Sequence, residues 1–200
     1  MNSLDKLTEL FSKFPGIGPR QARRFVYFLL YKNEGYLDEL TRAISGIRRE
    51  VTQCRTCFRY FPGTHTGQTV CGLCADAHRD DTLLMLVPRD VDLEAVEKSG
   101  GYQGRYFVLG GVVPILEKEP EKRIRLAELE ARLSSAFDIK EVILAMNANQ
   151  DGEHTAEFIK NYFKTSSLTF SLLGRGLSTG AELEYADPET LKSALENRTH

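Results

Sequence analysis

Cys54-Arg55-Thr56-Cys57 and Cys71-Gly72-Leu73-Cys74 are two CxxC pairs separated by thirteen residues, and they contain all four cysteines of the 200-residue chain. Each pair presents two thiolates from one tight turn, and two such turns can close a tetrahedron around a soft divalent ion. Four thiolates suit zinc and leave no position for a reacting water, so we expect a structural Zn²⁺ site. A disulfide is the alternative, but the sequence shows no signal peptide and no surplus cysteine.

Two histidines near the CxxC pairs, His65 and His78, are alternative candidates for metal ligands. Because four thiolates already fill a tetrahedral shell, we expect both histidines to be exposed or hydrogen-bonded. Between the two pairs, aromatic residues flank Pro62-Gly63, which predicts a short ribbon that turns at this dipeptide.

The charged residues are distributed unevenly along the chain. Residues 1–80 hold 12 Lys and Arg against 8 Asp and Glu, whereas the remainder holds 14 against 20, which together give the net charge of −2. A basic front favours a polyanionic ligand for the N-terminal part, although solvated faces produce similar asymmetries. No apolar run approaches the length of a membrane span and no targeting segment is visible, so we expect a cytoplasmic protein.

The N-terminal stretch reads as short amphipathic helices. Ser3 is the expected cap of a first helix whose apolar residues include Leu4, Leu7, Leu10 and Phe11. A second helix is expected from Pro19, and a third from about Leu37 to Val51. The apolar residues of the first helix are candidates for an interface between subunits, and burial within the subunit explains them equally well.

The turn between the first two helices, Phe14-Pro15-Gly16-Ile17-Gly18-Pro19-Arg20, has the pattern of a helix-hairpin-helix element. Gly16 and Gly18 let the backbone come close to a ligand, and the following helix N-terminus directs free N–H groups outward. Arg20, Arg23 and Arg24 place positive charge beside this turn. We therefore expect these five residues to bind DNA phosphates without reading the base sequence; a plain packing corner is the alternative.

From residue 80 onward the pattern alternates between strands and helices. Strands are expected at 82–87, 105–109, 141–146 and 167–173, with helices at about 92–97, 121–137 and 152–163 between them. This alternation predicts a mostly parallel sheet flanked by helices. Functional residues of such sheets gather at the carboxyl ends of the strands, where Pro88, Gly110-Gly111 and residues 147–153 lie.

The order of these motifs resembles the RecR family of bacterial recombination mediators along nearly the whole chain. The resemblance rests on residues 14–19, the four cysteines, residues 104–111, 141–145 and 151–156, and Gly180-Ala181-Glu182-Leu183-Glu184-Tyr185-Ala186-Asp187. It implies an α+β fold of several modules: a helix-hairpin-helix region at 1–53, a C4 zinc finger at 54–76, a Toprim α/β domain at 80–176 and a C-terminal extension at 177–200.

The resemblance also implies a function. It indicates a non-enzymatic DNA-binding homo-oligomer, commonly ring-shaped, that acts with RecO and RecF in recombinational DNA repair. Leu191 and Leu195 of the C-terminal extension are a second candidate interface between subunits.

The chain departs from the pattern of the family at the carboxyl edge of the predicted sheet. Pro88 stands where Toprim enzymes place a glutamate after the first strand, and Pro114-Ile115-Leu116-Glu117-Lys118 replaces the usual loop after the second. Asp151 and Glu153 remain as an acidic pair, which we expect to bind a protein partner. The alternative function is a metal-dependent Toprim nuclease or primase, which needs several carboxylates converging on Mg²⁺.

Overall fold

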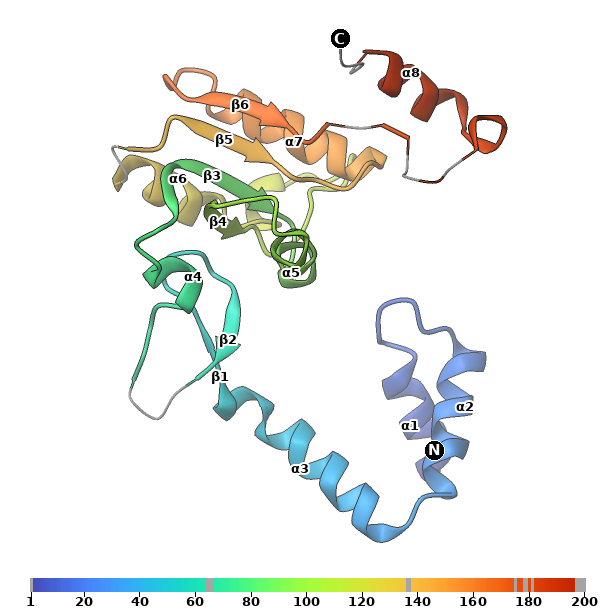
Figure 1. The fold of residues 1–200 in the computed structure, drawn as a ribbon. Helices are drawn as coiled ribbons and strands as arrows, with labels where there is room; N and C mark the ends of the chain where they lie inside the picture. Colours follow the sequence, from blue (N-terminus) through green and yellow to red (C-terminus); the bar gives the residue numbers. More distant parts are fainter. Residues whose placement is uncertain are drawn as a thin grey trace. The chain divides into compact units, whose positions relative to one another are not determined.

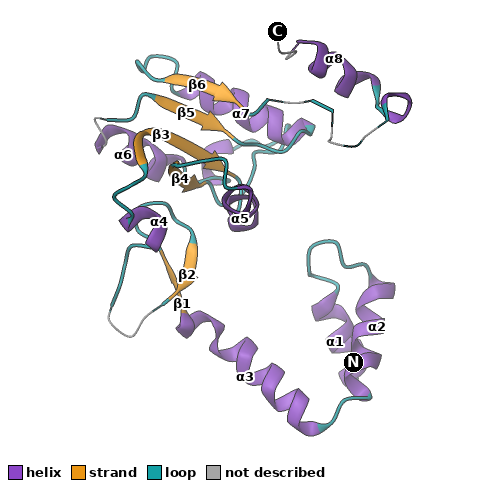
Figure 2. Cartoon of the chain, viewed as in Figure 1, coloured by secondary structure: helices purple, strands orange, loops and turns teal. Residues whose placement is uncertain are grey.

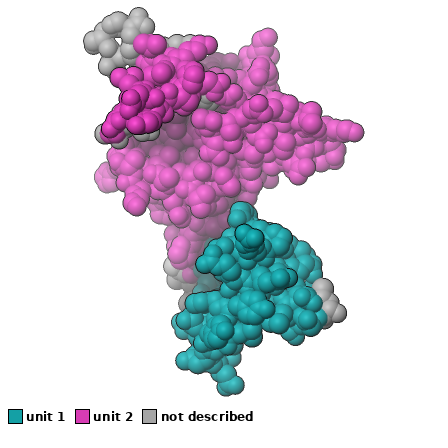
Figure 3. Space-filling view, turned by 90° about the vertical axis from the view of Figure 1, so that its right-hand side faces the viewer, with its two compact units in different colours: residues 1–51 teal, residues 52–200 magenta. Residues whose placement is uncertain are grey.

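The computed structural model describes residues 2–63, 67–135, 138–174, 176–177, 180 and 182–196. The chain divides into two compact units, residues 1–51 and residues 52–200 (Figure 3). Unit 1 is helical, whereas unit 2 contains the CxxC pairs and a mixed α/β region (Figure 2). In the described ranges, none of the helices combines the length and apolarity that crossing a bilayer requires.

Unit 1 consists of α1 (Ser3–Phe11), α2 (Pro19–Leu30) and α3 (Glu34–Glu50) (Figure 1). α1 packs against α2, and the rings of Phe11 and Phe25 lie 6.0 Å apart between centroids in an edge-to-face arrangement. Among the described residues of this unit, only Ala22 and Val26 are buried. The apolar residues of α1 remain at least partly exposed, so packing within the unit leaves much of its apolar surface uncovered.

Asparagine side chains begin three helices, and the sequence patterns had pointed to other residues. The Asn2 side chain accepts a hydrogen bond from the Asp5 N–H, so Asn2 and not Ser3 caps α1. Asn33 caps α3 in the same way, which starts this helix at Glu34, three residues before the predicted Leu37. The apolar periodicity misses the first turn because that turn faces solvent and carries a cap instead of core residues.

The segment around the cysteines contains a two-stranded sheet and a single helical turn. Strand β1 (Val51–Gln53) pairs with β2 (Tyr60–Pro62), and α4 (Gly72–Ala75) begins at the second CxxC pair. The chain reverses at the first CxxC pair between β1 and β2, and Pro62 is the last residue of β2. The Arg55 N–H donates to the Thr69 carbonyl at 2.9 Å, so the chain returns toward this pair after Gly63. Residues 64–66, next to the expected turn at Pro62-Gly63, lie outside the described residues. His65 lies outside the described residues, and His78 is exposed as expected.

The α/β region contains one four-stranded sheet in the order β4-β3-β5-β6, and all three strand pairs are parallel. This confirms the predicted architecture of N-terminal helices, a four-cysteine segment and an α/β domain with a parallel sheet. The strands and the helices of this region, with those of the C-terminal segment, are β3 (Asp80–Val87), α5 (Asp90–Ser99), β4 (Gly104–Val108), the 3₁₀ turn η1 (Pro120–Lys122), α6 (Leu126–Ser135), β5 (Glu141–Leu144), α7 (Gln150–Tyr162), β6 (Thr169–Leu172), the 3₁₀ turn η2 (Leu183–Tyr185) and α8 (Pro188–Glu196).

Helices cover both faces of the sheet (Figure 1). Leu129 of α6 and Ile159 of α7 pack with Phe107 of β4 in one core, and Leu93 of α5 packs with Val87 of β3 in the other. Because both faces are covered, the central strands read as continuous apolar runs.

One predicted helix start in this region is wrong, and a second differs from the structure by two residues. The helix expected from Glu121 begins at Leu126, because the N–H of Arg125 donates to the carbonyl of Leu109 at 2.8 Å and holds this part of the chain against the end of β4. Its predicted end reaches Ala136 and Phe137, which lie outside the described residues. α7 begins at Gln150 and is capped by Asn149, whose Oδ1 accepts the Gly152 N–H at 2.9 Å.

Candidate metal centre and nucleic-acid interface

The four cysteines come together in unit 2. One sulfur from each of Cys54, Cys57, Cys71 and Cys74 lies within 4.8 Å of the others, and none of the four forms a disulfide. The sulfurs of Cys57 and Cys71 are 3.6 Å apart, close to the ~3.8 Å edge of a tetrahedron with Zn–S bonds of about 2.3 Å. The donor set and its spacing therefore fit a tetrahedral thiophilic metal ion.

The electrostatic interactions among the four cysteine thiols also favour a bound cation. Hydrogen bonding among the thiols lowers the pKa of Cys54, chiefly through Cys57, and raises the pKa of Cys57, chiefly through Cys54. Three of the four residues are buried, so each additional thiolate would repel the others with little screening by water. A bound dication removes this repulsion and allows all four sulfurs to be deprotonated.

Backbone and side-chain contacts fasten the cysteine cluster to the edge of the four-stranded sheet. The carbonyl of Cys57 accepts the Val108 N–H of β4 at 2.8 Å. On the other side, the Arg105 guanidinium donates to the carbonyls of Leu73 and Cys74 at 3.0 and 3.3 Å and pairs with Asp81 at 2.6 Å. Sequence reasoning missed Arg105 because its contacts with the cysteine segment go to backbone carbonyls and its ion pair reaches Asp81, 24 residues earlier, and neither leaves a local pattern.

The turn between α1 and α2 has the geometry that a phosphate-binding hairpin requires. Gly16 has φ +74°, a conformation that favours glycine, and the Ile17 N–H donates to the Phe14 carbonyl at 3.0 Å. Gly18 is the N-cap of α2, and Pro19 follows at the first helical position. A methyl group added at either glycine would meet no atom within 4 Å, so the backbone of the turn is open to a ligand.

Three arginines extend from the start of α2 into solvent. Arg20, Arg23 and Arg24 are all exposed, and residues three or four positions apart share one face of a helix. The Arg24 guanidinium donates to Oε1 of Gln21 at 3.3 Å. The structure thus brings the predicted glycines and arginines to one exposed end of α2.

The predicted acidic pair lies in the first turn of α7. Asp151 is half-buried and Glu153 is exposed, and Gly152 between them is buried. Pro88, at the end of β3, is also buried. Among the described residues, no third histidine, cysteine or carboxylate joins Asp151 and Glu153 to form a metal-binding group.

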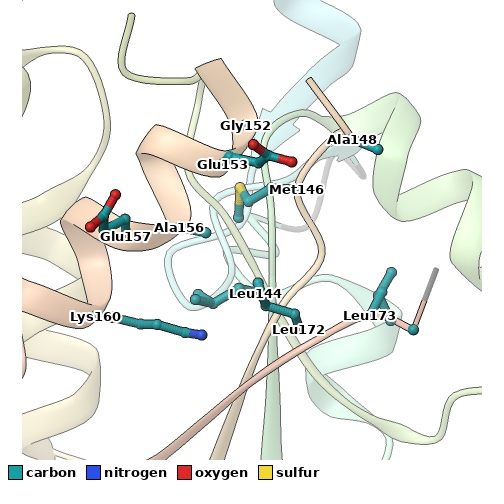
Figure 4. Close-up of a pocket in the computed structure, with 11 residues that line it drawn as sticks. Leu144, Met146, Ala148, Gly152, Glu153, Ala156, Glu157, Lys160, Leu172 and Leu173 are labelled. Atoms are coloured by element: carbon teal, nitrogen blue, oxygen red, sulfur yellow. The ribbon is translucent and has the colours of Figure 1, made fainter. Parts of the chain in front are cut away.

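A pocket of about 390 Å³ lies beside this turn, between α7 and the ends of β5 and β6 (Figure 4). Its wall is largely apolar and includes Met146, Leu172 and Leu173, whereas Glu153, Glu157 and Lys160 supply the charged groups. Apolar walls with a few charged groups suit a protein side chain better than a phosphate.

Comparison with known proteins assigns three parts of the chain. Family models match residues 4–47 as the RecR helix-hairpin-helix, residues 82–173 as a Toprim domain and residues 176–199 as the RecR C-terminal region. Recombination protein RecR of Bdellovibrio bacteriovorus is 32% identical over 203 residues, which cover 99% of this chain and 97% of that protein. The chain belongs to the RecR family.

Other members of the RecR family are similarly close. Recombination protein RecR of Streptococcus mutans is 37% identical over 194 residues, covering 97% of this chain and 95% of that protein. The protein of the same name from Chloroflexus aurantiacus is 38% identical, with coverage of 96% and 92%. These relatives confirm the resemblance inferred from the sequence and support a role in recombination and repair, and the α/β region is a Toprim domain.

Proposed function

We propose that this chain is a DNA-binding mediator of recombinational repair that performs no chemistry of its own. The observation that carries the proposal is the open turn at Gly16 and Gly18, followed by three exposed arginines at the start of α2. Backbone N–H groups and guanidinium groups together bind phosphate oxygens without reading bases. Binding by Gly16, Gly18, Arg20, Arg23 and Arg24 is therefore expected to depend on salt and not on DNA sequence.

We infer that the metal of the cysteine cluster is zinc and that its role is structural. The four thiolates fill a tetrahedral shell, and zinc prefers this ligand set over the oxygen-binding metals. Since the cluster also holds the end of β4 and contacts Arg105, the ion would stabilise both the CxxC segment and the edge of the sheet.

Assembly into a homo-oligomer, for which the family suggests a ring, is supported by the apolar surface of unit 1. Leu4, Leu7 and Leu10 of α1 are 37–44% exposed, and α1 contains no buried residue. Several hairpins on one oligomer would raise the effective concentration of binding sites along a DNA strand. A mass of only 22.6 kDa by light scattering across micromolar concentrations would contradict this assembly.

Asp151 and Glu153 are proposed to contact a protein partner, for which the family suggests RecO, with RecF as a further partner. Carboxylates at an exposed helix start complement a basic surface and repel DNA. The alternative, Toprim nuclease or primase activity, would need Mg²⁺ held by converging carboxylates, and Pro88 occupies the position of one of them.

The proposal is tested by measuring DNA affinity at several salt concentrations. Replacing Arg20 and Arg24 by alanine should weaken binding to all sequences and lower the slope of log K against log salt by ~1.8 for duplex DNA. The matched control replaces Lys6 and Arg42 by alanine. These substitutions remove the same number of positive charges from unit 1, at positions outside the turn. Equal binding by the double variant and the wild type would disprove the role of the turn.

A cleavage and synthesis assay with Mg²⁺ distinguishes the mediator from the enzyme. Metal-dependent nicking or synthesis that Asp151→Asn abolishes would make the Toprim domain catalytic. The mediator instead predicts that Asp151→Asn loses RecO binding and keeps DNA binding by the turn.

A further inference from the structure

A second group of cationic side chains lines a cleft in unit 2. The cleft has a volume of about 340 Å³ and lies between the first CxxC turn and α6. Arg55, Thr56 and Phe58 line it from the turn, and Glu128, Arg132 and Ser135 line it from the helix.

The Arg132 guanidinium is incompletely satisfied. Its Nε is buried and donates to no acceptor in the part of the chain that the structure describes. Glu128 lies one helical turn earlier and lines the same cleft, yet among the described residues no ion pair joins it to Arg132 or Arg55. A buried N–H without an acceptor destabilises a fold unless a ligand or water supplies the missing oxygen.

The backbone of Arg55 is held in place by its neighbours in the cysteine cluster. It lies between two buried cysteine ligands, and its N–H donates to the Thr69 carbonyl at 2.9 Å, while its side chain is exposed. A fixed backbone reduces the entropy that Arg55 loses when its side chain binds a ligand. The cleft therefore combines one pre-positioned exposed guanidinium with one partly buried guanidinium that lacks an acceptor.

We propose that this cleft is a second phosphate-binding site, which takes a phosphodiester group of the DNA strand. A planar guanidinium donates two parallel hydrogen bonds to phosphate oxygens, and the Thr56 hydroxyl can add a third donor. Phe58 forms a wall and not a stacking platform, because its ring already packs on Phe107 at 5.2 Å between centroids.

The inference rests on the proposed DNA binding and goes beyond it, because the cleft belongs to unit 2 and not to the hairpin. The carboxylate of Glu128 lines the same cleft and repels a bound phosphate. The cleft is therefore expected to contribute modestly to DNA affinity, and the size of this contribution depends on the charge of Glu128. This opposition gives a test in both directions: removing an arginine weakens binding, and neutralising Glu128 strengthens it.

The experiment uses the full zinc-loaded chain and a fluorescent oligothymidylate strand at several salt concentrations. Arg55→Ala with Arg132→Ala should weaken binding several-fold and lower the salt slope by ~1.4 for a single strand, whereas Glu128→Gln should tighten binding about two-fold or more. Glu94→Gln on the exposed side of α5 is the charge-matched control for Glu128→Gln, and Lys98→Ala on the same helix removes a single positive charge away from the cleft; neither should change the affinity or the salt slope. Zinc content and circular dichroism verify that each variant is folded.

Three outcomes separate the two proposals. In the first outcome, the Arg55 and Arg132 double variant binds with wild-type affinity and salt slope, while the Arg20 and Arg24 variant loses binding. This result would overturn the phosphate-binding role of the cleft and leave that of the hairpin intact. Absence of DNA binding by the wild type would overturn the proposed function itself. A nucleoside triphosphate is titrated separately: binding that requires Arg55 and Arg132 while DNA affinity stays unchanged would assign the cleft to a free nucleotide and overturn the DNA contact.

Discussion

Gly152→Ala is expected to destabilise the Toprim domain because α7 begins in direct contact with the chain that precedes it. A methyl group at this position would lie 2.1 Å from the Asn147 carbonyl oxygen and 3.0 Å from its carbon. Relief to ordinary contact needs a backbone movement of about 1.3 Å. That movement is opposed, because the same carbonyl accepts the Asn149 N–H at 2.9 Å and Asn149 caps the helix through the Gly152 N–H.

The size of the effect follows from two opposing contributions. Overpacking lowers the free energy of unfolding by about 1–3 kcal/mol. The higher helix propensity of alanine raises it by at most ~1 kcal/mol. Because the methyl group would lie 2.1 Å from a backbone oxygen, the overpacking cost is expected at its upper end, about 3 kcal/mol, and the net loss in the free energy of unfolding is about 2 kcal/mol. Such a loss lowers the melting temperature of a chain of this size by roughly 4–8 °C. Scanning calorimetry of the zinc-loaded protein measures this shift.

Gly174→Ala is the matched control for this substitution. Gly174 lines the pocket beside the same helix, has no positive φ, and a methyl group there would meet no atom within 4 Å. Its melting temperature should stay within about 2 °C of the wild type. If Gly152→Ala has the same melting temperature as Gly174→Ala, the close approach of the Asn147 carbonyl does not constrain the start of α7, and the expected destabilisation is refuted.

Three further predictions concern the metal centre and the buried polar groups. Cys71→Ser should bind less than about one zinc per chain and melt lower, whereas His78→Ala should keep its metal; equal zinc content in both would remove Cys71 from the ligand set. In the wild type, the Val113 N–H donates to Oγ1 of Thr155 at 2.8 Å. Thr155→Val removes this acceptor and should lower the free energy of unfolding, measured with urea, by about 1–3 kcal/mol, whereas Thr155→Ser should lower it less. Burial is the largest single influence on the pKa of Glu97 and raises it, but hydrogen bonding by Arg79 and Tyr106 together with the charges of Arg79 and Arg59 outweighs burial and holds the pKa below the ordinary 4.5. Because the folded pKa is depressed, this pair contributes stability above pH 4.5 that is lost as the pH falls through the folded value, and Glu97→Gln should flatten that part of the profile.

The sequence was sufficient for those features that depend on spacing along the chain. Two CxxC pairs predicted the cysteine cluster, and the glycines at 16 and 18 predicted the open turn because each requires only local backbone geometry. The apolar runs predicted β3 and β4, because a strand buried on both faces needs apolar residues at most positions. β6 has no buried residue, and its prediction rested on the alternation of strands and helices along the chain.

The features that the sequence did not predict depend on contacts between distant segments. The start of α6 is set by Arg125, whose N–H donates to the carbonyl of Leu109 just after β4 and whose side chain donates to the carbonyl of Val108 at the end of that strand. The pairing of β1 with β2 across the first CxxC pair was not predicted, because it joins Val51–Gln53, which begins where the third helix was expected to end, to the aromatic stretch after Cys57. Arg132 could have been noticed only from its burial, since an exposed arginine on a helix has the same pattern in the sequence.

The cysteine cluster also explains a feature of the sheet that its topology alone would not predict. β4 is an edge strand, yet all five of its residues are buried. The Cys57 carbonyl pairs with Val108 on the open side of this strand, and Arg105 connects it to the second CxxC turn. An uncovered edge strand is a template for aggregation, so the cysteine cluster protects the sheet as well as joining the two CxxC turns. Removal of the metal should therefore expose β4, which links the solubility of the Toprim domain to the four cysteines.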